Sequence, residues 1–584
     1  MSSDPILTFA IITDTHIRPP GGDDSSPFPV NDLANGRARY AVASLARHTP
    51  AFTVHLGDMI HPLPHLPTYP MAAGEALRIF EPLSENLHFV PGNHDIGDKP
   101  MAGSPAGPVT EETAGLYERF FGQDFFSFEH LGVRFIVINS SLAGTGSALE
   151  EKQRNWLEQE LAESAGQRLF LFSHYPPFID TVDEPLHYDN YEASSRAWLL
   201  DLLEKYEVEA VFSGHVHQFF YNRAGGVKLY CLPPTSFIRQ DYSELYPVEP
   251  APEFGRNDTG KFSYALVDVY EQGHRLRVVP TGGRSLEPGE ALAISDPVAV
   301  RPSPTPLTVH LRHAWARAVD LPYNGPMEEF GRKRARDDYP LLRLWQMGIE
   351  SVRTPLSDLV DPEYGPRIRD WAATGMRFCL FHAGIPTKEL WRECENNASF
   401  IEAVEFVSGT GDMSDLSDEL ATFNPDAGPE VQIGKFHSSA HEAKSGSKFA
   451  HSVSPGFKWA ERDGLLASLK ASDRNGCVKG VSFQINLDDD LAARLVEMND
   501  WARETGYRIQ AVVRLAVANP AVANFNSDAI DARIQLALQS VTNTPLVSLQ
   551  LDVLSDVDRG YHPRQGLIDR RSNFRPAGWT LARR

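Results

Sequence analysis

Six short apolar runs in the first half of the chain each end in a polar cluster, and five of these clusters carry histidine or aspartate. The runs read LTFAIITDTH, FTVHLGD, LHFVPGNHD, VRFIVINS, RLFLFSHYPP and VEAVFSGHVH. Continuous apolar runs of this length are typical of strands that are buried on both faces of a sheet. Because ligands of open α/β sheets bind beyond the carboxyl ends of the strands, we expect these clusters to converge on one site.

The length of 584 residues exceeds what one hydrophobic core supports, so the chain is expected to form at least two domains. The segment RSLEPGEALAISDPVAVRPSPTPLT, from Arg284 to Thr308, interrupts every helical or strand period with Pro, Ser and Gly. We therefore predict a first domain over residues 1–285, a proline-rich linker over 286–306 and a second domain over 307–584.

The formal net charge of −22 argues against binding to a nucleic-acid polymer or an anionic membrane, because those partners select basic surfaces. A small-molecule substrate is favoured, and a homo-oligomer is left open. The four cysteines are scattered without a C-x-x-C pair, which favours a reducing cytoplasm. The chain start lacks a basic segment before its apolar run, and no apolar stretch is long enough to span a bilayer.

Five motifs follow the strand-like runs in a fixed order: D-x-H, G-D, G-N-H-D, a lone histidine, and G-H-x-H. They supply seven candidate metal ligands, which are Asp14, His16, Asp58, Asn93, His174, His215 and His217. Any one motif alone is as well explained by a surface turn or a helix cap. Together they indicate one shared site. The resemblance described next implies that this site is dinuclear, and two cations about 3.5 to 4 Å apart can hold both the attacking and the departing oxygen of a phosphoryl displacement.

The order of these motifs resembles the signature of the calcineurin-like metallophosphoesterase superfamily. The flanking segments FFSFEHLGVRFIVINS, QRNWLEQEL, SHYPPF and PPTSF resemble its branch that cleaves cyclic nucleotides and glycerophosphodiesters. The resemblance covers residues 6 to 283 and implies an α/β fold of the αββα sandwich type. It also implies that Asp58 bridges two metals, that a water or hydroxide between them is the nucleophile, and that the remaining ligands form two sets: Asp14, His16 and His217, then Asn93, His174 and His215.

By the same resemblance, His94 is the catalytic residue that stabilises charge on the phosphoryl group or protonates the leaving group. Asp95 is expected to orient His94 or a neighbouring loop. The cofactors implied are two divalent metal ions, and mixed imidazole and carboxylate ligands favour manganese, iron or zinc over a lone magnesium or calcium ion. The sequence does not choose among these three metals.

The predicted enzyme is a metal-dependent phosphoric ester hydrolase, and the resemblance favours a phosphodiester over a phosphomonoester. A monoesterase of the same fold is the alternative. A protein phosphatase is less favoured, because that branch has arginines after its metal motifs, whereas Asp95, Ile96 and Gly97 follow G-N-H here.

Other residues near the motifs carry weaker predictions. His55 is expected in the core, and His61 and His65 are expected to be solvated rather than to face the substrate. Three residues are weak candidates for the pocket wall: Tyr175, Asn190 and Tyr191.

The second half alternates strand-like and helix-like segments with a regular rhythm. Eight runs have strand character: LTVHLRHA, IESVRTPL, MRFCLFHAG, IEAVEFVSG, VQIGKFHSS, GVSFQINL, RIQAVVRLA and LVSLQLDV. Amphipathic helices such as LAARLVEMNDWARETG and IDARIQLALQSV lie between several of them. Eight such units in about 260 residues predict a (β/α)8 TIM-like barrel.

The ends of these eight runs are polar, which suggests a pocket at the carboxyl ends of the barrel strands. The residues are Arg312, His313, Arg353, His382, Glu405, Lys435, His437, Gln484, Asn486, Arg514, Gln550 and Asp552. The alternative is a satisfied ion-pair network kept for packing or oligomerisation. The barrel would then shape or cover the first site, act on the released product as part of a bifunctional enzyme, or bind a small polar molecule as a ligand sensor.

Overall fold

The computed structural model divides the chain into two compact units. The first comprises Met1–Ala299 and Ala318–Tyr339, and the second comprises Val300–Arg317 and Pro340–Arg584. The segment 318–339, which the sequence placed in the second domain, thus belongs to the first unit. The structure describes residues 4–21, 26–101, 103–293, 302–312, 314–323, 331–408, 413–425, 427–437, 454–516, 526–556 and 565–583.

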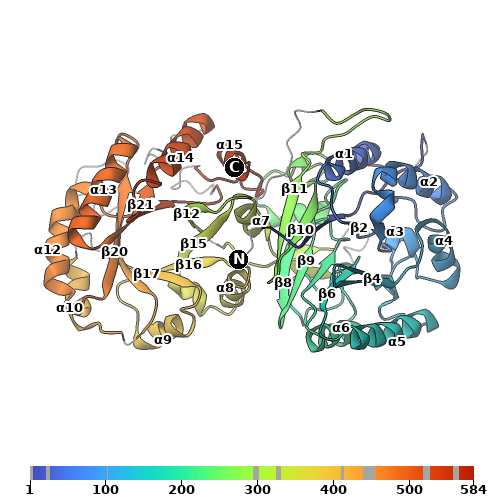
Figure 1. The fold of residues 1–584 in the computed structure, drawn as a ribbon, viewed down its shortest axis with the longest axis horizontal. Helices are drawn as coiled ribbons and strands as arrows, with labels where there is room; N and C mark the ends of the chain where they lie inside the picture. The colour runs from blue at the N-terminus through green and yellow to red at the C-terminus, as the bar shows by residue number, and fades with distance from the viewer. Residues whose placement is uncertain are drawn as a thin grey trace. The chain divides into compact units, whose positions relative to one another are not determined.

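Two sheets build the first unit (Figure 1). The five-stranded sheet has the order β11-β10-β1-β2-β3, and the six-stranded sheet has the order β4-β5-β6-β7-β9-β8. Their strands are β1 (Leu7–Ile12), β2 (Thr53–His55), β3 (Leu87–Phe89), β4 (Phe126–His130), β5 (Val133–Val137), β6 (Arg168–Ser173), β7 (Ala210–Ser213), β8 (Phe220–Ala224), β9 (Val227–Cys231), β10 (Ser263–Val269) and β11 (His274–Pro280). All six predicted runs of this half are strands: β1, β2, β3, β5, β6 and β7.

The first-unit helices are α1 (Ala34–Ala46), α2 (Tyr69–Phe80), α3 (Asn93–Ile96), α4 (Glu111–Phe121), α5 (Ala148–Glu163) and α6 (Ala193–Lys205). Short 3-10 helices are η1 (Pro29–Leu33), η2 (Glu81–Asn86), η3 (Ser140–Leu142), η4 (Gln240–Leu245) and η5 (Thr259–Lys261). One core joins α1, α2 and α4 to the β1 and β10 faces, and another joins α5 and α6 to β5, β6 and β7.

Aromatic side chains fill the space between the two sheets. The Phe9 ring of the first sheet lies 5.4 Å from Phe135 and 5.9 Å from Phe170 of the second sheet. Its neighbours in β1, Ala10 and Ile12, face the helical core instead. This alternation buries both faces of β1 and gives four layers, helix, sheet, sheet and helix, as the αββα expectation requires.

The second unit is a closed barrel of eight parallel strands in the order β12-β15-β16-β17-β18-β20-β21-β22, with β22 pairing back to β12. Its strands are β12 (Thr305–His310), β15 (Ile349–Pro355), β16 (Arg377–Ala383), β17 (Ile401–Ser408), β18 (Glu430–His437), β20 (Val478–Ile485), β21 (Arg508–Val513) and β22 (Val547–Leu551), with β19 (Ser454–Pro455) added at β18. The (β/α)8 prediction is confirmed, strand for strand.

Helices surround the barrel strands in Figure 1. They are α7 (Tyr339–Gln346), α8 (Tyr364–Ala372), α9 (Lys388–Asn396), α10 (Ser414–Thr422), α12 (Arg462–Ser472), α13 (Leu491–Thr505), α14 (Ser527–Val541) and α15 (Pro576–Ala582), with 3-10 helices η7 (Leu356–Leu359) and η8 (Trp459–Glu461). In the part of the chain that the structure describes, no helix is both long and apolar enough to cross a membrane.

Helix α13 shows how the sequence sets these bounds. The Asp490 carboxylate caps its start by accepting a hydrogen bond from the Ala493 amide at 3.0 Å. Gly506 ends it in the left-handed region, at a φ of 83°. The predicted stripe of Leu491, Leu495, Met498 and Ala502 is buried, so the helix packs through the face that its periodicity indicated.

Candidate metal centre

Strand ends from both sheets of the first unit supply the seven predicted ligands. Asp14 and His16 follow β1, and Asp58 follows β2. Asn93 begins α3 after β3, while His174 follows β6 and His215 and His217 follow β7. All seven side chains are buried, and they come together although up to 203 residues separate them along the chain. The expected convergence at the carboxyl ends of the strands is therefore present.

The backbone at this site is strained. Eleven described non-glycine residues have a positive φ, and five of them are the candidate ligands Asp14, His16, Asp58, His215 and His217, with φ between 46° and 66°. Each such conformation costs about 1 to 3 kcal/mol and persists only where the surroundings fix it. The concentration at one site indicates that tight turns aim these side chains inward.

Motif glycines allow the loops to approach closely. A Cβ at Gly92 would lie 2.1 Å from the Asp58 backbone nitrogen, and a Cβ at Gly214 would lie 2.1 Å from Thr13 Oγ1. No side chain fits at either distance, so the glycines of G-N-H-D and G-H-x-H are required by the packing of one ligand loop against another.

One set of donors joins β1, β2 and β7. The Nε2 atoms of His16 and His217 are 3.0 Å apart, and His217 Nε2 is 3.2 Å from Asp14 Oδ1. Asp58 Oδ2 lies 3.5 Å from His16 Nε2. The ligand atoms of these four residues all lie within 4.8 Å of one another.

A second set shares Asp58. Its other oxygen, Oδ1, is 3.3 Å from His174 Nε2. Asn93 Oδ1 lies 3.2 Å from that same nitrogen and 3.0 Å from His215 Nδ1. Asp58 thus offers one oxygen to each set, which is the geometry of a bridging carboxylate.

The donors fit a pair of divalent cations. Burial, with the charge of His94, holds the pKa of His16 well below its ordinary value, and burial, with His174, does the same at His215. Neutral imidazoles facing carboxylates are the form that binds metals. Burial also opposes the proton at His174, but the Asp58 carboxylate outweighs it and raises the pKa of His174 to about 9, a proton that a bound cation would displace.

Backbone carbonyls orient three of the imidazoles. The Nδ1–H of His174 donates to Leu56 O at 2.7 Å, and that of His217 donates to Phe237 O at 2.6 Å. The Nε2–H of His215 donates to Tyr188 O at 3.2 Å. Each bond turns the opposite ring nitrogen toward the cluster, as metal-binding histidines require.

Residues 7–219 match the family model described as calcineurin-like phosphoesterase. The N-terminal half has the calcineurin-like phosphoesterase fold. Three relatives match only part of the chain. The mouse (Mus musculus) serine/threonine-protein phosphatase CPPED1 is 33% identical over 185 residues, which are 30% of this chain and 55% of that protein.

The other two relatives are bacterial. A protein named "Probable cyclic nucleotide phosphodiesterase" from Vesicomyosocius okutanii is 29% identical and covers 26% of this chain and 59% of its own length. One named "Probable glycerophosphodiester phosphodiesterase GpdQ" from Arcobacter nitrofigilis is 30% identical, over 23% of this chain and 45% of its own. The chain spans about half the length of the curated relatives it matches, and their names include both phosphatases and phosphodiesterases.

His94, the predicted catalytic residue, lies at the edge of the cluster of candidate ligands and is half-buried. Its ring lies 4.7 Å from that of His16, and its Nδ1–H donates to His61 O at 2.5 Å. This bond leaves Nε2 as the atom that can give or take a proton. The backbone amide of His94 donates to Asp58 Oδ1 at 2.9 Å, which ties the residue to the bridging carboxylate.

Asp95 orients a neighbouring loop rather than the His94 ring. Its carboxylate accepts hydrogen bonds from the amides of Gly92 at 2.9 Å and Ile60 at 3.3 Å. The carboxylate therefore joins the G-N-H-D turn to the loop that carries Asp58.

His61 was underestimated from the sequence. Its Nδ1 lies 3.4 Å from His16 Nδ1, and His16, His61 and His94 form a third group of close donor atoms. His65 is exposed, as expected, and His55 is buried in the core against Phe80. His61 and His65 lie in the same proline-rich loop, and the sequence gives no signal that distinguishes a loop histidine near the metal centre from an exposed one.

The weak wall candidates lie behind the cluster. The Tyr175 ring is 4.0 Å from His215, but its hydroxyl donates to Asp98. Tyr191 bonds to Ser173, and Asn190 bonds within its own loop. The residue that sequence reasoning missed is Tyr188, whose hydroxyl accepts a hydrogen bond from Asn93 Nδ2 at 3.2 Å.

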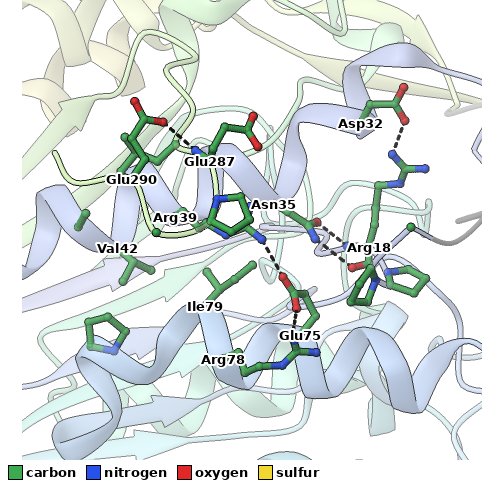
Figure 2. Close-up of a pocket in the computed structure, with 18 residues that line it drawn as sticks. Arg18, Asp32, Asn35, Arg39, Val42, Glu75, Arg78, Ile79, Glu287 and Glu290 are labelled. Atoms are coloured by element: carbon green, nitrogen blue, oxygen red, sulfur yellow. Dashed lines mark hydrogen bonds and ion pairs between the residues drawn. The ribbon is translucent and has the colours of Figure 1, made fainter.

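A pocket of about 880 Å³ lies elsewhere on this unit, between α1, α2 and residues 286–290 (Figure 2). None of the seven candidate ligands lines the pocket. Among its lining residues is Arg18, which follows the candidate ligand His16 by two positions in the sequence. Glu75 pairs there with both Arg39 and Arg78, at 2.7 and 2.6 Å. Its charged groups are largely engaged with one another, so the pocket adds nothing to the metal chemistry.

In the barrel, five of the twelve predicted polar strand-end residues form ion pairs. Arg353 Nε donates to Glu405 Oε2 at 2.7 Å, and Ser482 donates to the other oxygen at the same distance. Arg312 pairs with Asp552, and Lys435 with Glu461. His382 is half-buried and its Nδ1–H donates to Gly384 O at 3.2 Å.

The remaining barrel candidates differ. Gln484 and Gln550 are buried, Asn486 is half-buried, and Gln550 Nε2 has no hydrogen-bond partner in the described chain. Arg514 is 5% exposed, and its buried Nη1 has no hydrogen-bond partner among the described residues. His313 lies outside the described residues, as does the side chain of His437.

Proposed function

We propose that this protein hydrolyses a small organic phosphodiester at the paired donor sets of its N-terminal half. The observation that carries the proposal is the division of one carboxylate between two sets, with Asp58 Oδ2 facing His16 and Oδ1 facing His174. Two bound divalent cations would lower the pKa of an attacking water and neutralise charge on the phosphoryl oxygens. Manganese, iron and zinc all suit these donors.

The chain's own groups have separate tasks. Asp58 holds the two donor sets at a fixed spacing, and the carbonyls of Leu56 and Phe237 fix the rings of His174 and His217. His94, with Nδ1–H held by the His61 carbonyl, presents Nε2 to donate a proton to the departing oxygen.

The preference for a diester is part of the proposal and has one structural support. A monoester dianion is best gripped by an uncommitted guanidinium fork. Arg239, beside the second donor set, is instead buried against Asp189 and Asp241. The name of the mouse relative makes a phosphatase the alternative.

The test compares bis(p-nitrophenyl) phosphate with p-nitrophenyl phosphate, each with Mn²⁺, Fe²⁺, Zn²⁺ or Co²⁺. We expect the diester to be cleaved faster. Faster cleavage of the monoester would overturn the diester preference, and cleavage of neither compound with any metal would overturn the hydrolase assignment.

The proposed location of the protein is the cytoplasm. All four cysteines are free thiols, which fits a reducing compartment.

A second candidate function is the binding of a small anion at the carboxyl ends of the barrel strands. Arg514 favours it, because a buried guanidinium nitrogen without a hydrogen bond is costly unless a ligand satisfies it. Burial lowers the pKa of Arg514, and the nearby Asp552 carboxylate is already bonded to Arg312 and Gln565.

Calorimetric titration of inorganic phosphate tests this function. The chain with Asp58→Ala removes the competing metal site, and the same chain with Arg514→Gln added is the comparison. We expect binding only where Arg514 is present. Equal binding, or none in either chain, would favour the satisfied ion-pair network instead.

A further inference from the structure

A hairpin from beyond the proline-rich segment packs into the phosphoesterase unit. Strands β13 (Val319–Pro322) and β14 (Arg332–Ala335) pair antiparallel. Leu321 and Ala335 are fully buried in one cluster with Val216, which separates the two ligands of G-H-x-H. Burial alternates along β14, so that Lys333 and Ala335 point inward while Arg332 and Arg334 are exposed.

Lys333 is buried without any exposed side-chain surface. Its Nζ lies 2.5 Å from Asp189 Oδ2, bonds also to Asp241, and stands 4.1 Å above the Tyr242 ring. A buried ammonium persists only when it is paired in this way.

The partner of Lys333 touches the second donor set. Asp189 Oδ1 lies 3.5 Å from His215 Nε2, and the preceding residue, Tyr188, accepts from that same nitrogen through its carbonyl. The Tyr188 hydroxyl accepts from Asn93 Nδ2. Two adjacent residues therefore orient two of the donors that share Asp58.

The charges around Asp189 balance only with the hairpin in place. Two carboxylates, Asp189 and Asp241, face two cations, Arg239 and Lys333, and all four side chains are at most 5% exposed. Without Lys333, Arg239 would be left as the cation of this group bonded directly to both buried carboxylates. That uncompensated charge favours displacement of the 187–190 loop.

We propose that Lys333 is a positioning residue, which holds Asp189 and Tyr188 against His215 and Asn93 and so completes the second metal-binding set. The phosphoesterase centre then depends on a segment that follows the first barrel strand in sequence. Residues 1–299 alone would lack it. The inference rests on the proposed function only in that both require metals at this site.

The test is metal binding by the full chain with Lys333→Met, followed by Co²⁺ titration of visible absorption and by metal content after dialysis. Loss of an outer partner lowers metal affinity about 10- to 100-fold. We expect that loss for one of two bound metals, with the other unchanged. Lys333→Arg should restore part of the affinity, and Arg334→Ala, on the exposed face of the same strand, should match the wild type.

Equal weakening of both metals, no weakening, or the same loss in Arg334→Ala would overturn the proposal. Should Lys333→Met fail to fold, Asp189→Asn supplies the second variant, and it must weaken the same single metal. Because the readout is metal affinity, a wild-type chain that binds two metals but cleaves no phosphoester would refute the proposed function and leave this inference standing.

Discussion

Both halves of this chain place polar side chains beyond the carboxyl ends of parallel strands, but the groups are of different kinds. In the phosphoesterase unit, lone-pair donors face one another, as where the Nε2 atoms of His16 and His217 lie 3.0 Å apart. In the barrel, opposite charges face one another, as where Arg353 Nε lies 2.7 Å from Glu405. The barrel supplies its own counter-charges, whereas the donors of the first site are grouped as divalent cations would require.

Polar strand ends alone therefore do not identify a metal site. Buried imidazole and carboxylate donors that converge with no Lys or Arg among them form a candidate metal site, because bound cations would offset their desolvation. Buried pairs of opposite charge satisfy each other and are compatible with a purely structural role. Arg514 is the barrel residue that departs from this pattern.

The largest effect is expected from Asp58→Ala, which removes the one group common to both donor sets. Turnover should fall by about 10³-fold or more, the scale on which lost electrostatic stabilisation acts, and metal content after dialysis should fall as well. His65→Ala, an exposed histidine of the following loop, is the control and should change neither. If the Asp58 variant kept its metals, the description of the first unit as a site of metal donors, in contrast to the self-paired charges of the barrel, would be wrong.

His94→Ala sharpens the distinction between metal donors and proton donors within the first site. We expect turnover to fall by about 10²- to 10⁴-fold, the usual contribution of general acid catalysis. Metal content should stay at the wild-type level, because His94 belongs to neither of the donor sets that share Asp58 and its Nδ1–H is held by the His61 carbonyl. A metal loss equal to that of Asp58→Ala would show that His94 is a ligand.

In the barrel, breaking one pair should cost stability rather than metal. Glu405→Leu leaves the buried Arg353 without its partner and should destabilise the barrel by about 3 to 5 kcal/mol. Urea unfolding followed by tryptophan fluorescence measures this. Adding Arg353→Met should recover much of the loss, since a well-packed apolar pair removes both charges. A double variant as unstable as the single one would contradict the self-paired description.

The smallest effect is expected at the amino ends of β6 and β7, where Glu209 bonds to Arg168 and to His274 of β11. Burial raises the pKa of Glu209, but His274 and Arg168 outweigh it and lower the pKa to about 2. This is below the unfolded value of about 4.3, so the stabilisation is present above pH ~4.3 and is lost as the pH falls toward 2.

Glu209→Gln should therefore lower the free energy of unfolding at pH 7 by about 1 to 3 kcal/mol and flatten its decline between pH 4 and 2. Thermal unfolding across this pH range measures both. Glu151→Gln, on the exposed face of α5, is the matched control. If the free energy of unfolding of the Glu209 variant declined between pH 4 and 2 as steeply as that of the wild type, Glu209 would not be charge-paired in solution.

Much of the architecture could be predicted because its signals are local. The six runs of the first half and the eight of the second are strands, since an apolar run bounded by turns keeps its character wherever it packs. The candidate ligands come together because parallel strands present their carboxyl ends on one side. His61 was misjudged because a loop histidine has the same local pattern whether it faces solvent or a metal site.

The return of residues 318–339 to the first unit could not be predicted in this way. The segment RKRA is, locally, an ordinary charged run, and its composition indicates a solvated surface. Lys333 is buried only because Asp189, 144 residues earlier, accepts its charge. A contact over that separation leaves no period or spacing in the sequence.

The sequence by itself determined the strand runs, the barrel and which residues are candidate donors, because apolar periodicity and motif order are properties of short segments. The tertiary structure alone decided which oxygen of Asp58 faces each donor set and which strand-end charges neutralise one another. It also decided that a hairpin from beyond the proline-rich linker contacts Asp189, the neighbour of His215. These are matters of distance and charge balance between distant segments, and only the folded chain fixes them.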